Sequence, residues 1–76
     1  MLVSEIDQYA IDKVRERRKK LKISQQALAN ELGVTRGFIG NVENPNYKDK
    51  YNLEHLNSLA KILECSPKDF MPENPL

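Results

Sequence analysis

Residues 24–43, with the sequence S-Q-Q-A-L-A-N-E-L-G-V-T-R-G-F-I-G-N-V-E, decide the fold of this chain. Ser24 and Thr35 each precede a short helical stretch, and their side-chain oxygens can accept the free amide hydrogens of a first turn. Gly33 lies between the two stretches, where a tight turn requires the left-handed backbone conformation that glycine adopts without strain. The segment therefore predicts two short helices joined by a three-residue turn.

The same helix-start signal recurs outside this segment, at Asn52 and Ser66. Residues 44–52 are expected to form a loop, because Asn44-Pro45 stops the preceding helix. No stretch alternates apolar and polar residues with a period of two, so no strand is expected. The sequence therefore predicts an all-α chain of five helices, at residues 5–21, 25–32, 36–43, 53–64 and 67–71.

Helical periodicity then predicts which side chains form the core. Three sets are expected to point inward: Ala10, Val14 and Leu21 on the first helix; Thr35, Ile39 and Val42 on the third; Leu53, Leu56, Leu59, Ala60 and Leu63 on the fourth. Met1, Phe70 and Met71 are expected to pack at the ends of the bundle, and His55 and Cys65 are interpreted as structural.

Composition narrows the possible functions. The chain has 76 residues, with 12 Lys and Arg against 11 Asp and Glu, one Cys and one His. This length predicts one domain over residues 1–76, and one Cys with one His can form neither an internal disulfide nor a structural zinc site. No apolar run approaches the roughly 20 residues of a membrane span, and residues 1–10 lack the pattern of a signal peptide. With no catalytic motif, we expect a cytoplasmic domain that is not an enzyme, with no cofactor, no metal and no membrane partner.

The cations are distributed unevenly along the chain. Residues 13–22 carry seven of the twelve Lys and Arg residues and a single acid, Glu16. This asymmetry favours a polyanionic partner. The alternative is a solvated helix face whose cations lie near the helix C-terminus, where the helix dipole stabilises them. Charge alone leaves both interpretations open.

Residues 18–43 resemble the Cro/repressor-type helix-turn-helix family, also called the XRE family. The elements S-Q-x-x-L-A, L-G-V-T and I-x-x-V-E occur in the family order and at the family spacing, and the resemblance covers residues 10–71. It implies a compact five-helix bundle, a lambda-repressor-like DNA-binding domain with its helix-turn-helix at about residues 24–44. It also implies that helix 36–43 enters the DNA major groove and that two protomers read two half-sites.

The expected base-reading residues lie on the outer side of helix 36–43. Arg36 can pair with guanine or a phosphate, Asn41 can pair with adenine, and Phe38 can touch a thymine methyl. Gly37 completes this set by its family position, although it offers no side chain. Gly37 and Gly40 both depart from the family pattern, and each costs a helix roughly 1 kcal/mol relative to Ala. Close approach of the backbone to DNA is one explanation, and tolerated local weakness is the other.

The resemblance also implies residues that contact phosphate and residues that hold the recognition helix. The expected phosphate contacts are Ser24, Gln25, Gln26, Thr35, Asn44, Lys48 and Lys50. Tyr47 and Tyr51 are equally compatible with phosphate contact and with packing. Arg18 falls on the apolar face of the first helix, and the family pairs this position with that of Glu43. We therefore expect a partly buried Arg18–Glu43 ion pair that orients the recognition helix.

These features predict a sequence-specific transcriptional regulator, a repressor that binds a palindromic operator as a homodimer in a bacterial or phage setting. Antitoxin and restriction-modification controller are alternatives within DNA binding. A function of a different class stays open, because helix 36–43 offers few side chains for contact with DNA and the net charge of the chain is only +1. In that alternative the chain is a protein-interaction module that keeps the fold and does not read DNA.

Overall fold

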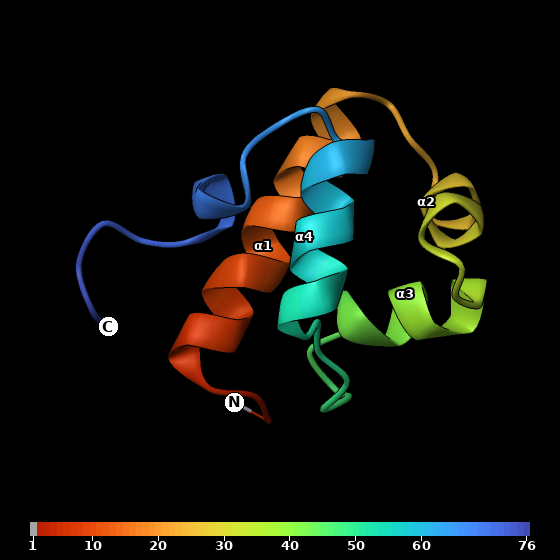
Figure 1. Cartoon of the computed structure of the whole chain (residues 1–76). Coiled ribbons are helices and arrows are strands. Elements are labelled where there is room, and N and C mark those ends of the chain that lie inside the picture. The colour runs from red at the N-terminus through yellow and green to blue at the C-terminus, as the bar shows by residue number, and fades with distance from the viewer. Residues whose placement is uncertain (1) are drawn as a thin grey trace.

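The computed structural model describes residues 2–76, so the expectation that Met1 packs at the end of the bundle lies outside the described residues. It contains α1 (Glu5–Lys20), α2 (Gln25–Leu32), α3 (Arg36–Val42), α4 (Leu53–Ile62) and a short 3₁₀ helix, η1 (Pro67–Phe70) (Figure 1). Residues 2–76 contain no strand, which confirms the all-α class. Of the five expected helices, four are α-helices, and the last is a single 3₁₀ turn after which Met71 is already extended.

The helix starts follow the capping signals in the sequence. The side-chain oxygens of Ser24, Thr35, Asn52 and Ser66 each accept a backbone amide hydrogen in the first turn of the following helix. Three of the α-helices, α1, α3 and α4, end one or two residues before the predicted positions. Leu21, Glu43 and Leu63 are C-cap residues of α1, α3 and α4.

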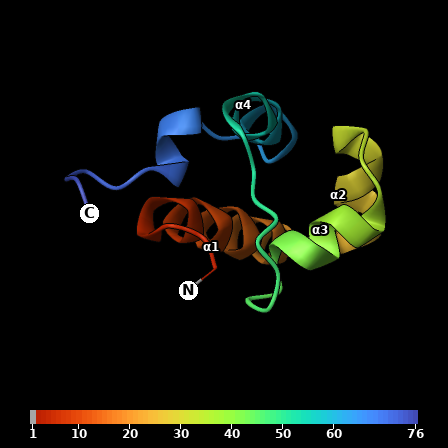
Figure 2. The same ribbon diagram turned by 90° about the horizontal axis from the view of Figure 1, so that it is seen from below.

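The helices form two layers around one apolar core. In Figures 1 and 2, α4 lies across α1, the pair α2–α3 lies to one side, and η1 with the C-terminal segment lies to the other. The fully buried side chains come from every element of this arrangement: Val14, Leu28, Ile39, Leu59, Leu63 and Phe70. Within residues 2–76, no helix has both the length and the apolar character needed to cross a membrane.

Three residues expected in the core lie at the surface. Leu53 is 79% exposed and Leu21 is 38% exposed. Leu53 is the first residue of α4, before that helix meets the core, and Leu21 follows the last residue of α1, where the chain turns away through Lys22 at φ 59°. Thr35 is also exposed, because its side chain caps α3. All three residues stand at helix ends, where a position on the apolar face no longer ensures contact with the core.

Candidate nucleic-acid interface

The turn between α2 and α3 is closed by backbone hydrogen bonds to one carbonyl. Gly33 adopts φ 77° and ψ 30°, and the amides of Gly33 and Val34 both donate to the oxygen of Ala29, at 2.9 and 3.0 Å. Ala29 itself is fully buried, so the small side chain lies where the helices pack closely. This geometry fixes α3 against α2, with Ile39 and Val42 buried beneath it.

The C-terminal end of α3 is held to α1 by a bidentate ion pair. Arg18 donates from Nε and Nη2 to the two carboxylate oxygens of Glu43, both at 2.8 Å. The third nitrogen of the same guanidinium donates to the carbonyl of Ile23 at 2.8 Å. The side chains of Arg18 and Glu43 are only 10% and 4% exposed. The pair therefore joins α1, the segment before α2 and the end of α3 at one point.

Two further residues complete this cluster. Gln25 donates from Nε2 to Glu43 Oε1 at 3.0 Å, and Arg15 lies 3.7 Å from the same oxygen. Burial raises the pKa of Glu43, but the hydrogen bonds from Arg18 and Gln25 and the charges of Arg18 and Arg15 outweigh it, so the pKa lies below 4.5. Sequence reasoning missed Arg15, although its position three residues before Arg18 places both on neighbouring parts of one helix face.

The middle of α3 is held to α4 through aromatic side chains. The ring of Phe38 lies 5.3 Å from that of His55 and 6.1 Å from that of Tyr51, measured between centroids. His55 is in turn fixed because its Nδ1 accepts the amide hydrogen of Asn52. Phe38 was expected on the outer side of α3, and the structure differs: the half-buried ring packs inward against the core. Aromatic partners from the loop and from α4 make the inner position more favourable than solvent.

Tyr51 is a core residue rather than a surface ligand. It is 5% exposed, and its hydroxyl is buried without a hydrogen-bond partner among residues 2–76. Burial raises the pKa of Tyr51, and the nearby charge of Glu43 raises it further. Tyr47, in contrast, is 49% exposed.

The outer side of α3 carries few side chains. Arg36 and Gly37 are exposed, and Asn41 is half-buried. A Cβ added at Gly37 would meet Thr35 Oγ1 at 3.8 Å, and one added at Gly40 would meet Gln25 Oε1 at 3.7 Å, both ordinary contacts. Packing within the protein therefore does not require glycine at either position.

A family model described as helix-turn-helix matches residues 14–70, which include α2, the Gly33 turn and α3. The chain belongs to this helix-turn-helix family. The Repressor protein C2 of Salmonella phage P22 is 43% identical over 56 residues, which are 74% of this chain and 25% of that protein. The chain thus spans about a quarter of the length of this curated relative.

Two solved structures resemble the whole bundle. The crystal structure of the P22 c2 repressor in complex with a synthetic operator matches with a TM-score of 0.68 and 37% identity, over 86% of this chain and 96% of that one. The restriction-modification controller protein C.AhdI from Aeromonas hydrophila matches with a TM-score of 0.72 and 25% identity, over 88% and 93% of the two chains.

The polar residues around the helix-turn-helix have internal partners in most cases. Ser24 and Thr35 cap α2 and α3, Gln26 donates to Asn30 at 2.9 Å, and the side chain of Asn44 accepts from the amide of Asn46 at 3.0 Å. Lys48 is exposed. Lys50 differs from the expectation, because its ammonium lies 3.3 Å from Asp7 on α1. Nothing local in the sequence indicates that contact, since the two residues are 43 positions apart.

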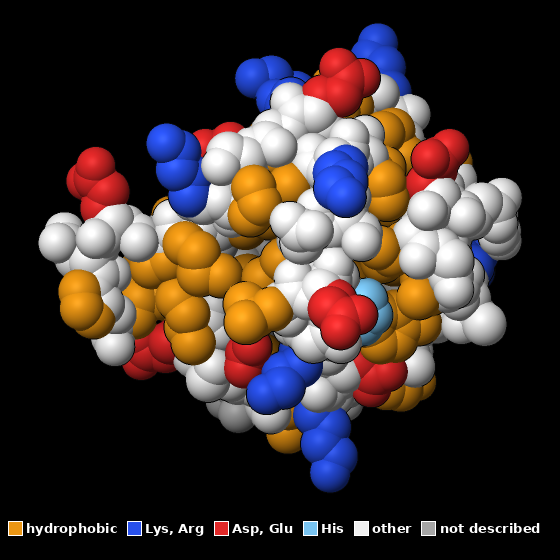
Figure 3. Space-filling model, in the orientation of Figure 1, with side chains coloured by type: hydrophobic (Ala, Val, Ile, Leu, Met, Phe, Trp, Pro, Cys, Tyr) orange, Lys and Arg blue, Asp and Glu red, His pale blue; other side chains and the backbone are white. Residues whose placement is uncertain are grey.

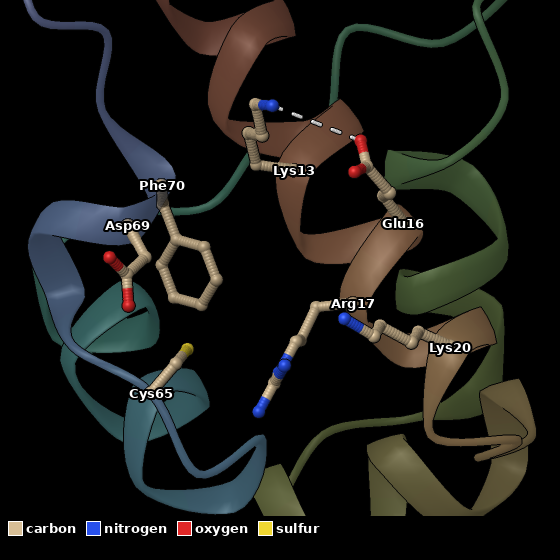
Figure 4. A pocket seen from close by; sticks show the side chains of 7 residues that line it. All are labelled: Lys13, Glu16, Arg17, Lys20, Cys65, Asp69 and Phe70. Carbon is tan, nitrogen blue, oxygen red and sulfur yellow. Dashed lines mark ion pairs between the residues drawn. The ribbon is translucent and has the colours of Figure 1, made fainter.

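The basic run of α1 is partly used inside the fold. Arg17 donates to the carbonyls of Leu63 and Glu64, at 2.9 and 3.2 Å, and so caps the C-terminal end of α4. Figure 4 shows Arg17 reaching across a hollow of about 210 Å³, with Lys13 paired to Glu16 at its edge. This hollow carries charges of both signs. The cations of α1 therefore do not form a uniformly basic surface, and Arg17 among them stabilises the fold.

Proposed function

We propose that this chain is a sequence-specific DNA-binding transcriptional regulator that represses by occupying a palindromic operator as a homodimer in the bacterial cytoplasm. The observation that carries the proposal is the presentation of α3: its inner side is anchored to α1, α2 and α4, while Arg36 and Gly37 stand exposed on its outer side. A rigidly held helix with a free outer edge is the geometry needed to enter a major groove.

Two side chains would read bases. Arg36 can donate two hydrogen bonds to guanine O6 and N7, and Asn41 can make the matching pair of hydrogen bonds with adenine. Gly37 would contribute by letting the backbone approach the base edges closely. Phe38 would act indirectly, because its ring fixes α3 on α4.

The residues that contact phosphate would lie on either side of the outer side of α3. Gln25 stands at the start of α2, and its amide has a second hydrogen beside the one donated to Glu43, so it could bind a phosphate oxygen while held in place. Ser24 and Thr35 use their oxygens as capping acceptors and retain hydroxyl hydrogens to donate. Gln26, Asn44 and the exposed Lys48 would follow the DNA backbone, with Lys50 a weaker contributor because Asp7 compensates its charge.

The test separates base reading from phosphate binding by fluorescence anisotropy on a selected duplex and a scrambled one. Arg36→Ala and Asn41→Ala should each cost about 1–3 kcal/mol on the selected duplex and much less on the scrambled one. Lys48→Ala should weaken both and reduce the salt slope by about one unit. Lys61→Ala, the same charge change near the end of α4, is the matched control and should change neither.

Equal losses on both duplexes for Arg36→Ala and Asn41→Ala would mean that α3 does not read sequence. If the unmodified chain binds no duplex at any salt concentration, the protein-interaction module becomes the better interpretation.

The likeness to C.AhdI over nearly its full length favours a second function within DNA binding, a restriction-modification controller. Both functions use the same interface, and the genes beside the operator distinguish them.

A further inference from the structure

Arg15 adds a positive charge that the buried ion pair does not require. Arg18 already donates to both carboxylate oxygens of Glu43, at 2.8 Å each. The Nε of Arg15 lies 3.7 Å from Oε1 of the same carboxylate, which is too far for a hydrogen bond. Two guanidinium groups therefore face one carboxylate, and the surplus charge belongs to Arg15, whose side chain is 49% exposed. An ion pair exposed to this extent contributes little to stability, so stability does not explain Arg15.

Arg15 lies beside the point where the proposed function places a phosphate. Gln25, the first residue of α2, donates to Oε1 of Glu43 at 3.0 Å, so the polar ends of Gln25 and Arg15 converge on one oxygen atom. A Cβ added at Gly40 would meet Oε1 of Gln25 at 3.7 Å, which places Gln25 against the middle of α3. Arg15, Gln25 and Gly40 thus lead from α1 across the start of α2 to α3. A phosphate bound by Gln25 would be within reach of the Arg15 guanidinium.

The other arginine and lysine side chains in this part of α1 are placed differently. Lys13, two residues before Arg15 and so about 200° around the helix, pairs with Glu16 at the hollow between α1 and η1. Arg17 lies at the same hollow and caps α4 (Figure 4). On the face drawn in Figure 3, Lys and Arg side chains stand singly among acidic and apolar ones. A phosphate contact from α1 therefore depends on the position of Arg15 and not on a broad basic surface.

The chemistry of the two side chains is complementary. A guanidinium group presents several N–H donors in one plane and keeps its charge at every physiological pH, which suits a phosphate. The amide of Gln25 is a neutral donor with a second hydrogen free of Glu43. Because the carboxylate of Glu43 is buried and fixed by Arg18, its attraction restrains the Arg15 side chain before any ligand arrives. Less conformational entropy is then lost on binding.

We propose that Arg15 binds the same DNA phosphate as Gln25, as the charged member of a two-residue clamp that Glu43 holds in place. The inference rests on the proposed function and deepens it, because it gives α1 a direct part in DNA binding. It also gives the buried carboxylate a second role: besides pairing with Arg18, it positions both members of the clamp.

Fluorescence anisotropy of the full chain on a selected and a scrambled duplex, across a salt series, tests the inference. Arg15→Ala should weaken binding to both duplexes by about tenfold and reduce the salt slope by about one unit, because phosphates carry no sequence information. Arg15→Lys keeps the charge and should keep the slope. Lys13→Ala is the matched control: it removes one cation and one loose ion pair, at 3.9 Å, from the opposite side of α1 and should change neither quantity comparably.

A double-mutant cycle tests whether Arg15 and Gln25 share one phosphate. If they do, the combined variant Arg15→Ala with Gln25→Ala should lose less affinity than the product of the two single losses, because either change alone already weakens the same contact. A combined loss equal to that product would show two independent sites and overturn the clamp.

Thermal melts by circular dichroism separate a DNA contact from a structural role. The melting midpoint of Arg15→Ala should match that of the unmodified chain, because Arg18 retains Glu43. A lower midpoint with an unchanged salt slope would mean that Arg15 acts through the fold, and it would overturn the inference. Arg15→Ala that binds both duplexes as Lys13→Ala does would also overturn it and leave the proposed function standing. An unmodified chain that binds no duplex would overturn the proposed function and this inference with it.

Discussion

At the residue scale, backbone conformation explains one glycine of the helix-turn-helix, Gly33, and does not explain another, Gly40. Gly33 lies at φ 77°, where any side chain is strained even though no atom lies within 4 Å of a Cβ placed there. Gly40 has an ordinary helical backbone and room for a methyl group, yet it weakens the short α3. The backbone therefore explains the first glycine, and internal packing does not explain the second.

Alanine at these two positions should have opposite effects on stability. Gly33→Ala should lower the free energy of unfolding by about 1–2 kcal/mol, because alanine disfavours the left-handed conformation. Gly40→Ala should raise it by up to about 1 kcal/mol, because alanine favours the helix and its methyl group meets only ordinary contacts. Urea denaturation measures both. A destabilised Gly40→Ala would show that Gln25 cannot adjust to the added methyl group.

The same Gly40→Ala variant decides between the two explanations of that glycine. If it is more stable but binds a selected duplex less tightly than the unmodified chain, the position is kept small for close approach to DNA. If binding is unchanged, the glycine is a tolerated local weakness. The control is Lys61→Ala, which lies outside α2 and α3.

At the element scale, α3 depends on its neighbours. It has seven residues, too few for an isolated helix to be stable in water. Its end is fixed to α1 by Glu43, and its middle is fixed to α4 by Phe38. These partners lie on α1 and α4, two segments far from each other in the sequence, so the direction of α3 is a property of the assembled bundle.

Removal of one member of the buried ion pair should be costly. Glu43→Ala leaves the guanidinium of Arg18 buried without its counter-ion and should lower the free energy of unfolding by about 3–5 kcal/mol. A chain of this size has only about 4–11 kcal/mol in total. The double change Arg18→Met with Glu43→Leu should recover much of the loss, because no charge is left without its partner. Urea denaturation of the three proteins checks this. A midpoint for Glu43→Ala close to that of the unmodified chain would contradict it.

Low pH should also destabilise the fold, because it protonates Glu43. The pKa of Glu43 is below 4.5 in the folded state, so the unfolded state takes up protons first as the pH falls. The contribution of Glu43 is therefore complete above about pH 5 and is lost as the pH drops through the folded pKa. Thermal melts between pH 7 and pH 2 should fall less steeply for Glu43→Gln than for the unmodified chain. Glu73→Gln, on the exposed tail, should follow the unmodified curve.

At the scale of the whole molecule, size constrains the operator. The chain extends over 31 Å along its longest axis, which is comparable with one turn of DNA, about 34 Å, so two copies fit side by side on half-sites one turn apart. Sites selected from a random duplex library should therefore be inverted repeats with centres about 10 base pairs apart.

Insertion of about five base pairs between the half-sites should reduce the affinity to that of a single half-site, because the half-sites then face opposite sides of the helix. Electrophoretic mobility shifts on the two duplexes measure this. A duplex with the original spacing and a substituted central sequence is the control. Equal affinity for the two spacings would indicate protomers that bind independently.

The sequence by itself determined the helix starts, the left-handed turn at Gly33 and the class of the fold, because capping and turn conformation depend on residues within one helical turn. It also determined the family, because the motif elements lie close together in the chain. Only the tertiary structure decided that Leu53 is exposed, that Phe38 turns inward and that Lys50 pairs with Asp7. Each of these depends on which distant segments come together, and the local sequence around a residue does not contain that information.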